Sequence, residues 1–374
     1  MNSEIKIYTD ISSLTESQIK NLNPLLAFHW KDLDLKAMLE GAKNHASLLT
    51  LTRDPGEAEW FVLPMLWSYY LWNRKSNMHQ ALALSVLASH YKKRLVVWHS
   101  GDLVPIMPFD GAQVFLPGML RSKAEANQIA CPAFIDDPQP IWGNSRTLIR
   151  EKQDKPKVGF CGYGSIDPLK FAWSILAGLK LNIASSLKKY DFNQVPIVPA
   201  TSLRARALRN LESHPDIETC FLIRDKHTTA KRSKIVSNGA SATEVFYSNI
   251  YETDYTLCLR GFGNWSYRFY ETLACGRIPI FVDTDCVLPL SSKIDWRRFC
   301  VWIDSSERHR IGEKVFDFHS ALSPTDFVEL QKACRRLWRE HFSLEGCMRN
   351  ISAYLQPDAK TGERNDSQEP VSII

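Results

Sequence analysis

Paired cysteines are absent from this chain: its nine cysteines are scattered singly, and no Cys-x-x-Cys pair occurs. Zinc sites and disulfide frameworks need closely spaced or evenly paired cysteines, so both are disfavoured and a reducing compartment is expected. An apolar run of ~18 residues, the length that crosses a bilayer, is also missing. A complete Gly-x-Gly-x-x-Gly motif and a Walker lysine are missing too, which argues against dinucleotide-dependent and P-loop enzymes.

A strong excess of one charge is absent as well. The chain has 46 lysines and arginines against 41 aspartates and glutamates, a net charge of +5. This balance lacks the concentrated basic patch of a nucleic-acid-binding protein, so no nucleic-acid partner is expected. It is compatible with a phosphate-bearing substrate and with peripheral attraction to an anionic membrane. The N-terminus, Met1 to Lys6, does not read as a targeting segment, and we predict a cytoplasmic protein, peripheral at most at the inner membrane face.

The chain is longer than one hydrophobic core usually supports, so two domains are expected in its 374 residues. Apolar residues make up 44%, which is typical of a globular protein. Strand and helix patterns alternate, which predicts an α/β fold. Composition then divides the chain into an N-terminal domain 1–145, a polar linker 146–157, a second domain 158–335, a C-terminal helix 336–355 and a disordered tail 356–374.

The clearest local pattern runs from residue 255 to residue 282. The apolar run Tyr255 to Leu259 predicts a buried parallel strand, and a glycine-bearing loop follows it. Ser266 is a plausible helix N-cap, Gly276 stands where a left-handed C-terminal residue is usual, and residues 278–282 predict the next strand. Strand, loop, helix and strand make a βαβ unit, whose loop and helix N-terminus favour an anionic ligand.

Further glycines and arginines are expected near the same sheet edge. Gly162-x-Gly164 ends a predicted strand, and a helix over 169–179 is expected to pack behind that strand. Arg224 ends the next predicted strand, and a helix before it carries three more arginines, Arg204, Arg206 and Arg209. Guanidinium groups suit phosphate oxygens, although a solvated, charged helix face is the more common explanation for any one of them.

In the first domain, His99 and Asp102 follow a predicted buried strand that ends at Trp98. A histidine and a carboxylate at the carboxyl end of such a strand suit a general base or a contact to an acceptor hydroxyl group. The alternative is that Ser100 and Asp102 close a turn through local hydrogen bonds. The sequence leaves both interpretations open.

Several short motifs occur in order, with suitable spacing, around the βαβ unit. These motifs are Cys258-Leu-Arg-Gly261, Ser266-Tyr-Arg-Phe-Tyr-Glu271, Gly276-Arg-Ile-Pro-Ile280, Leu288-Pro-Leu290 and Ile294-Asp-Trp296. Together they resemble the motif block of exostosin-like glycosyltransferases, glycosyltransferase family 47, in a soluble form of bacterial type. Animal members carry an N-terminal membrane anchor that is not visible here, so a cytosolic enzyme of bacterial type is expected.

The resemblance implies a GT-B architecture: two Rossmann-like domains face each other across a cleft, and a C-terminal helix packs back on the N-terminal domain. It also implies a nucleotide-sugar donor, usually a UDP-sugar, and inversion at the anomeric carbon without a metal or other cofactor. Asp283-Thr-Asp285 has the form of a metal-binding triplet. Because it follows the strand after the donor motif, we interpret it as a turn.

By position in the motif, Glu271 is expected to accept hydrogen bonds from donor hydroxyl groups, and Arg260 and Arg268 to neutralise the leaving diphosphate. The loop amides of Gly261 to Asn264 and the helix that begins after Ser266 would assist. Gly162, Arg204 and Arg224 complete the predicted donor site. The structural alternative is an ion pair between Glu271 and Arg268.

An inverting transfer needs a base on the opposite side of the sugar, so the predicted catalytic residues are Asp102 and His99 of the first domain. The expected acceptor is a glycan or a lipid-linked saccharide in surface polysaccharide synthesis. Three alternatives remain: a GDP-sugar donor, a non-catalytic exostosin-like binding protein, and a Rossmann-type dinucleotide enzyme, which the missing Gly-x-Gly-x-x-Gly disfavours.

Overall fold

The computed structural model describes residues 5–11, 14–19, 21–26, 49–143, 149–164, 167–187, 192, 195–224 and 241–355. The predicted tail, 356–374, and residues 225–240 lie outside the described residues.

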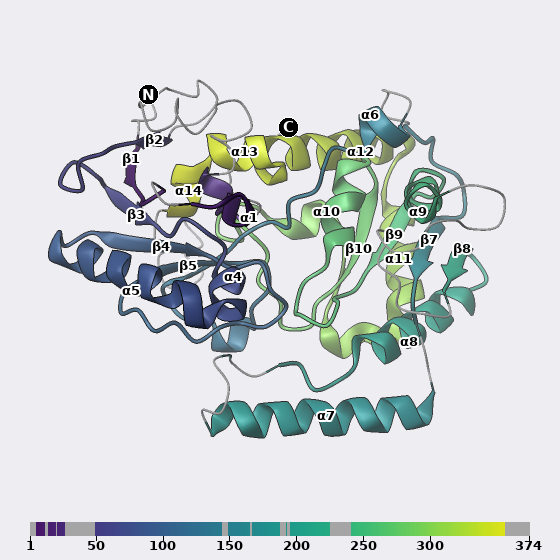
Figure 1. The fold of residues 1–374 in the computed structure, drawn as a ribbon. Coiled ribbons are helices and arrows are strands. Elements are labelled where there is room, and N and C mark those ends of the chain that lie inside the picture. Colours follow the sequence, from purple (N-terminus) through teal and green to yellow (C-terminus); the bar gives the residue numbers. More distant parts are fainter. Residues whose placement is uncertain are drawn as a thin grey trace.

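The first domain is built on a six-stranded sheet in which every pairing is parallel (Figure 1). The strand order is β2-β1-β3-β4-β5-β6, and the strands are β1 Ile5–Tyr8, β2 Leu49–Leu51, β3 Trp60–Val62, β4 Arg94–Trp98, β5 Gln113–Leu116 and β6 Gln128–Ala130. Its described helices are α1 Glu16–Ile19, α4 Trp67–Trp72, α5 Arg74–His90 and the 3₁₀ turn η1 Arg121–Lys123. Such parallel pairing needs crossover connections, as an α/β fold requires.

The second domain has a five-stranded parallel sheet with the order β11-β10-β9-β7-β8. Its strands are β7 Lys157–Gly162, β8 Glu218–Ile223, β9 Tyr255–Cys258, β10 Ile278–Val282 and β11 Val301–Ile303. The chain continues from β7 to β8 on one side of β7 and then returns to place β9 on its other side, so the winding direction reverses between β7 and β9. Open α/β sheets bind ligands at such a switch point, outside the carboxyl ends of the strands.

Helices cover both faces of the second sheet. On one face, α8 Ala200–Glu212 and α11 Ile311–Ala321 pack on the strands through Leu208, Leu211 and Val315. On the other face lie α9 Ala242–Tyr251, α10 Tyr267–Ala274 and α12 Pro324–Leu337. The remaining elements are α6 Gln139–Trp142, α7 Pro168–Ser186 and the 3₁₀ turns η2 Trp296–Arg298 and η3 Ser305–Arg310.

The βαβ unit predicted from residues 255–282 forms as β9, α10 and β10. Gly276 has a φ of 65°, the left-handed conformation expected of it, which an L side chain would adopt only with strain. Ser266 precedes α10 as predicted, but its side chain makes no capping hydrogen bond.

The helix predicted over 169–179 needs a larger correction. It forms as the 19-residue α7, but it lies along the outside of the body instead of packing behind β7 (Figure 1). The helix that packs against the core beside that strand is α8, which contributes Leu203 and Leu208. Apolar composition alone did not distinguish a helix that buries its apolar face from one that exposes it.

The described part of the polar stretch predicted as a linker is held against the second domain. Arg150 is ion-paired with the buried Asp254, with Nε and Oδ1 2.6 Å apart, and its backbone N–H donates to Gln331 over 3.0 Å. The Lys157 backbone N–H donates to the other carboxylate oxygen of Asp254 over 2.9 Å. These contacts fix the path by which the chain enters β7.

The chain returns to the first domain at its C-terminal side, as a GT-B architecture requires. After α12 come the π-helical turn η4 Trp338–Phe342, α13 Leu344–Arg349 and α14 Ile351–Leu355, which cross from the second sheet toward the first (Figure 1). Their buried side chains join the core of the first domain beside Ile7, Val96 and Phe115, and these side chains are Cys347, Met348, Ile351 and Tyr354. The predicted fold class is therefore confirmed.

Candidate functional site

The loops after β7 and β9 meet at the switch point of the second sheet. Arg268, in the first turn of α10, donates from Nη2 to the backbone carbonyl of Cys161 over 2.7 Å, and its guanidinium lies 4.4 Å from the Phe160 ring centroid. A Cβ atom built on Gly162 would come within 2.9 Å of the same Nη2 atom. The glycine at the end of β7 therefore makes room for an arginine that the motif loop supplies.

Two other predicted arginines lie beside it. Arg204 of α8 donates from Nη2 to the Arg260 carbonyl over 2.7 Å, and Arg260 itself is only 5% exposed and donates to the Val198 and Gly261 carbonyls. Burial lowers the pKa of Arg204 to about 9, and the positive charges of Arg268 and Arg260 lower it further. The pKa of Arg260 is lowered to about 10, chiefly by burial.

These three side chains are called here the arginine cluster: Arg204, Arg260 and Arg268. Across the chain as the structure describes it, no member forms an ion pair with a carboxylate, and each has a buried Nε atom without a hydrogen-bond partner. Buried like charges with free N–H donors are unfavourable by themselves. They create a site whose electrostatics favour an anion with several oxygens.

Arg224 is close to the arginine cluster, at the end of β8. Its Nη2 atom donates to the Ala242 carbonyl over 2.9 Å and contacts the Sγ atom of Cys161 at 3.3 Å. Its charge contributes to lowering the pKa of Arg268. The structure thus brings together Gly162 and the four arginines predicted for the donor site, although they come from four separate elements.

Glu271 lies on α10 one turn after Arg268. Burial raises its pKa to about 7, while Arg268 and a hydrogen bond from Tyr247 act in the opposite direction. In the described residues, Glu271 and Arg268 do not form the ion pair considered as the structural alternative. The Nε atom of Arg268 has no hydrogen-bond partner in the described chain, and Tyr247 of α9 is a neighbour of Glu271 that the sequence did not identify.

The first domain covers the motif loop. A Cβ on Gly263 would lie within 2.8 Å of Oδ1 of Asp102, and a Cβ on Gly118 would lie 2.5 Å from Cδ1 of Trp265. Asp102 is exposed. Burial raises the pKa of Tyr267, and the negative charges of Asp102 and Glu271 raise it further. Of the two predicted catalytic residues, Asp102 therefore faces the motif loop from the opposite domain.

His99 has a different environment. Its side chain is 4% exposed and lies against Gly101, where an added Cβ would come within 2.4 Å of Nε2. Burial lowers the pKa of His99 to about 4, so the imidazole is neutral at physiological pH. Its two ring nitrogens have no hydrogen-bond partner within the described chain.

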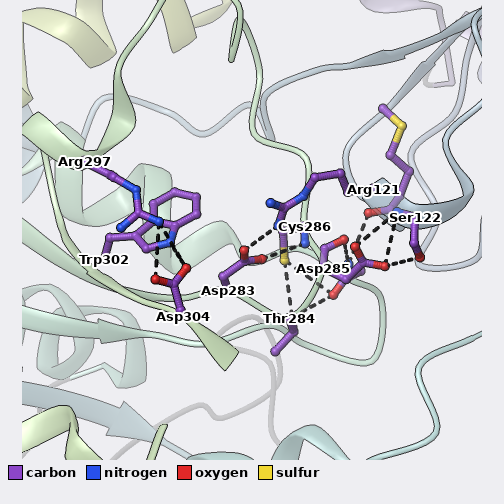
Figure 2. Close-up of polar contacts among 11 residues, drawn as sticks. Arg121, Ser122, Asp283, Thr284, Asp285, Cys286, Arg297, Trp302 and Asp304 are labelled. Atoms are coloured by element: carbon purple, nitrogen blue, oxygen red, sulfur yellow. Dashed lines mark hydrogen bonds and ion pairs between the residues drawn. The ribbon is translucent and has the colours of Figure 1, made fainter. Parts of the chain in front are cut away.

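A second set of contacts joins the two domains next to the motif loop (Figure 2). Residue Leu120 forms an antiparallel bridge with Cys286, Arg121 is ion-paired with Asp283, and the Ser122 backbone N–H donates to Oδ1 of Asp285 over 3.1 Å. Asn264 of the motif loop donates to the carbonyls of Met119 and Asp285 over 3.1 and 3.0 Å, respectively. We call these contacts the interdomain clasp.

The clasp explains the Asp283-Thr-Asp285 triplet. The chain turns at Asp285, which has a φ of 67°, and the Cys286 backbone N–H donates to Asp283 over 3.0 Å. The chain bends at the triplet, and its carboxylates bind a guanidinium and a backbone amide of the first domain. The described part of the chain contains no group of three or more His, Cys, Asp or Glu side chains placed to hold a metal ion.

Two cavities lie near the carboxyl ends of the second sheet. Arg260, Asn264 and Ser266 line a cavity of about 20 Å³, which has room for a water molecule only. A cavity of about 590 Å³ lies on the α8 side, beside Leu259 and Val282, and its basic lining residues are Arg206, Arg209, Arg308 and His309. The sequence did not identify the last two, because η3 is distant from α8 in the chain. Separately, no described helix is both long and apolar enough to cross a bilayer.

The fold and this site define a two-domain α/β protein of the GT-B class, with buried arginines at the switch point of the second sheet. Residues 199–315 match the family model of the Exostosin GT47 domain. This range contains α8 and the whole βαβ unit, and hence every residue of the arginine cluster. The resemblance is confirmed over these residues, which are similar to the exostosin-type domain of glycosyltransferase family 47.

Two curated relatives are similar to this chain over short segments. Exostosin-1 of Drosophila melanogaster is 34% identical over 89 residues, which cover 23% of this chain and 11% of that protein. A probable glucuronosyltransferase of Oryza sativa subsp. japonica is 30% identical over 66 residues, 18% of this chain and 15% of that protein. The matched segments span a small part of either relative.

Among solved structures, TarM of S. aureus aligns over 79% of this chain and 55% of its own, with 10% identity and a TM-score of 0.35. The spinosyn forosaminyltransferase SpnP aligns over 94% and 98%, with 12% identity and a TM-score of 0.32. With scores this low, the assignment of the fold class rests on the two parallel sheets and the returning C-terminal helices.

Proposed function

We propose that the protein is a glycosyltransferase that moves a sugar from a nucleotide-sugar donor, a UDP-sugar, to a glycan or a lipid-linked saccharide in surface polysaccharide synthesis. The observation that carries the proposal is the arginine cluster at the switch point, inside the segment that matches the exostosin model. Buried guanidinium groups without carboxylate partners suit a diphosphate, which carries charge on several oxygens.

In this proposal the donor diphosphate lies between Gly162 and the arginine cluster, with Arg224 at its edge. The amides of Phe262 to Asn264 and the N-terminus of α10, after Ser266, face the same charge. The predicted amide of Gly261 does not contribute, because its N–H donates to the Trp265 carbonyl over 2.9 Å. Glu271 accepts hydrogen bonds from the ribose hydroxyl groups. As the bond between the anomeric carbon and the diphosphate oxygen breaks, charge grows on the diphosphate, and these donors stabilise the transition state more than the ground state.

Inversion places the acceptor on the side of the sugar away from the diphosphate. The acceptor hydroxyl oxygen attacks the anomeric carbon, its proton passes to a base, and the nucleoside diphosphate leaves. Asp102 is the proposed base because it is the exposed carboxylate of the first domain against the motif loop. His99, neutral but buried, is the second candidate, and it would need Gly101 to move. The proposed reaction requires no metal.

The 20 Å³ cavity beside Asn264 and Ser266 does not hold a nucleotide sugar. Donor entry on this side therefore requires the interdomain clasp to open. A GDP-sugar donor and a non-catalytic binding protein are the alternatives, and nucleotide binding without any turnover would favour the second. We further propose a cytoplasmic enzyme that works at the inner face of the membrane.

The experiment is a thermal-shift titration with UDP, GDP and CMP, each with and without EDTA. A nucleotide at 100 times its Kd stabilises the folded protein by about 2.7 kcal/mol, which raises Tm by several degrees. We expect UDP to raise Tm equally with and without EDTA, and Arg268→Gln to lose the shift. Arg297→Gln is the matched control, because Arg297 is an exposed arginine paired with Asp304. No shift with any nucleotide would refute the proposal.

A further inference from the structure

Helix α7 carries its apolar side chains on its outer face. Exposed fractions are 74% for Leu169, 72% for Trp173, 58% for Leu176, 61% for Ile183 and 63% for Leu187. These positions recur at spacings of four, three, seven and four residues, so they share one stripe of the helix. A surface helix of a globular protein normally turns such a stripe toward the core.

The inner face of α7 carries the half-buried Phe171, whose ring centroid lies 5.7 Å from the guanidinium of Arg206, and beyond it small and polar residues. Asn182 exchanges two hydrogen bonds with the backbone of Val195, of 3.0 and 2.7 Å, and Ser185 donates to the Phe192 carbonyl over 2.5 Å. Gly178 is buried, with the Ile197 backbone 3.7 Å from an added Cβ. Hydrogen bonds thus fix which face points outward, so the exposure of the stripe is built into the fold.

The charge of α7 is of one sign. Between Pro168 and Ser186 the helix contains Lys170 and Lys180 and no acidic residue, and both lysines are exposed. Lys170 lies 3.6 Å from the N-cap residue Asp167. Lys180 falls within the apolar stripe, eleven residues after Leu169.

This pattern distinguishes between two occupants. If a second copy of the chain covered the stripe, Lys180 would be buried among apolar side chains, close to a like charge. At the surface of an anionic bilayer the same side chain extends its ammonium group to the headgroups while its stem stays among the acyl chains. An exposed tryptophan, several exposed leucines and two lysines are features that α7 shares with helices that lie in the plane of a membrane surface.

The position of α7 relates it to the site. It begins shortly after Gly162, at the carboxyl end of β7, and the segment after it returns to the first domain, where Phe192 bridges Pro105 in the loop after β4. With 19 residues it is about 28 Å long. Helix α7 therefore extends from the carboxyl edge of one sheet to that of the other, along one side of the molecule (Figure 1).

We propose that α7 is an in-plane membrane-binding helix, which docks the protein on an anionic phospholipid surface with the carboxyl edges of both domains beside the bilayer. This arrangement favours a lipid-linked saccharide over a free glycan as the acceptor, an inference that rests on the proposed function. The docking itself does not depend on the reaction.

The test is co-sedimentation of the full chain with vesicles of phosphatidylcholine, with and without phosphatidylglycerol. We expect binding to the anionic vesicles that weakens in high salt. The triple variant Leu169→Gln, Trp173→Gln, Ile183→Gln should bind more than about tenfold more weakly, because burying one large apolar side chain is worth about 1.5–3 kcal/mol. Lys180→Glu should weaken binding to the anionic vesicles in particular.

The matched control is Trp72→Gln with Val86→Gln, which removes two exposed apolar side chains, 83% and 69% exposed, from α4 and α5. It should bind vesicles like the unmodified protein. An unchanged UDP thermal shift in each variant shows that its nucleotide site is intact. Absence of any nucleotide shift in the unmodified protein would count against the proposed function only, because vesicle binding does not depend on the reaction. Three results would overturn the membrane inference. The first is failure of the unmodified chain to bind anionic vesicles, and the second is binding of the triple variant as tight as that of the unmodified chain. The third is a dimer of the unmodified chain in light scattering that is absent in the triple variant.

Discussion

The Nη2 atom of Arg268 and the Cα atom of Gly162 are neighbours across the switch point, and an added Cβ on the glycine would approach that nitrogen to 2.9 Å. The two residues come from different strand-loop units, and Arg268 also donates to the carbonyl that precedes Gly162. Placement of one guanidinium thus depends on the absence of one methyl group.

Gly162→Ala tests this dependence. The atom it would meet is the end of a flexible side chain, so Arg268 should move at a stability cost below about 1 kcal/mol. We expect nucleotide affinity to fall about tenfold, because a charge-assisted contact to phosphate is worth about 1.5 kcal/mol. Isothermal titration with UDP measures the affinity. Gly164→Ala is the control, because its nearest neighbour, at 3.5 Å, is in ordinary contact. Equal affinity of both variants would contradict the assigned role of Arg268.

Glu271→Gln should stabilise the protein, and more so at high pH. The pKa of Glu271 is raised to about 7 in the folded protein from 4.5. At pH 8 the folded chain must keep a partly buried carboxylate ionised, whereas at pH 5 the carboxyl is protonated and the cost is mostly gone. The expected gain is about 2–3 kcal/mol at pH 8 and less than about 1 kcal/mol at pH 5. Urea unfolding at both pH values measures it; a gain independent of pH would mean that ionisation is not the cause.

Removal of the clasp arginine should loosen the two domains. Arg121→Ala leaves the carboxylate of Asp283, whose side chain is 9% exposed, without its guanidinium partner. Since Arg121 itself is half exposed, a loss of about 1 kcal/mol is expected. Small-angle scattering should also show a larger radius of gyration. Arg297→Ala removes an arginine from an exposed ion pair, with Asp304, that lies wholly within the second domain, so it should change neither the stability nor the radius of gyration. A compact Arg121→Ala protein would show that the clasp does not limit opening.

Burial of His99 should make the folded protein less stable in acid. Its folded pKa of about 4 lies below the ordinary 6.5, so between these values the unfolded chain binds a proton that the folded chain does not. Stability should therefore fall by about 1–2 kcal/mol from pH 7 to pH 5 through this residue alone. His99→Leu should remove that part of the pH dependence. If its unfolding curves at the two pH values differ as much as those of the unmodified protein, His99 is not the group that titrates.

Local patterns were sufficient for the βαβ unit. The apolar run at Tyr255, the glycine at Gly276 and the next apolar run each depend on residues close in the chain, and the structure has β9, α10 and β10 there. The members of the arginine cluster could be predicted only singly, as candidate phosphate-binding residues, since they lie on separate elements. The proximity of Arg204 to Arg260 depends on how α8 packs.

Long-range contacts could not be predicted in the same way. Arg121 and Asp283 are 162 residues apart and belong to different domains, and no local pattern marks either as a partner of the other. The orientation of α7 was likewise hidden, because its apolar pattern is the same whether the stripe is buried or exposed. Burial of His99 depends on how the ring folds against Gly101, which a strand pattern does not specify.

The return of α13 and α14 to the first domain sets the order in which the protein can be completed during synthesis. Met348 and Ile351 belong to the core around β1 and β4, which are made hundreds of residues earlier. While the second domain is being translated, the first domain exposes an apolar surface that only the later residues of α13 and α14 cover. A nascent chain that stops before α13 therefore leaves the first domain unfinished, even though every strand of that domain has already left the ribosome.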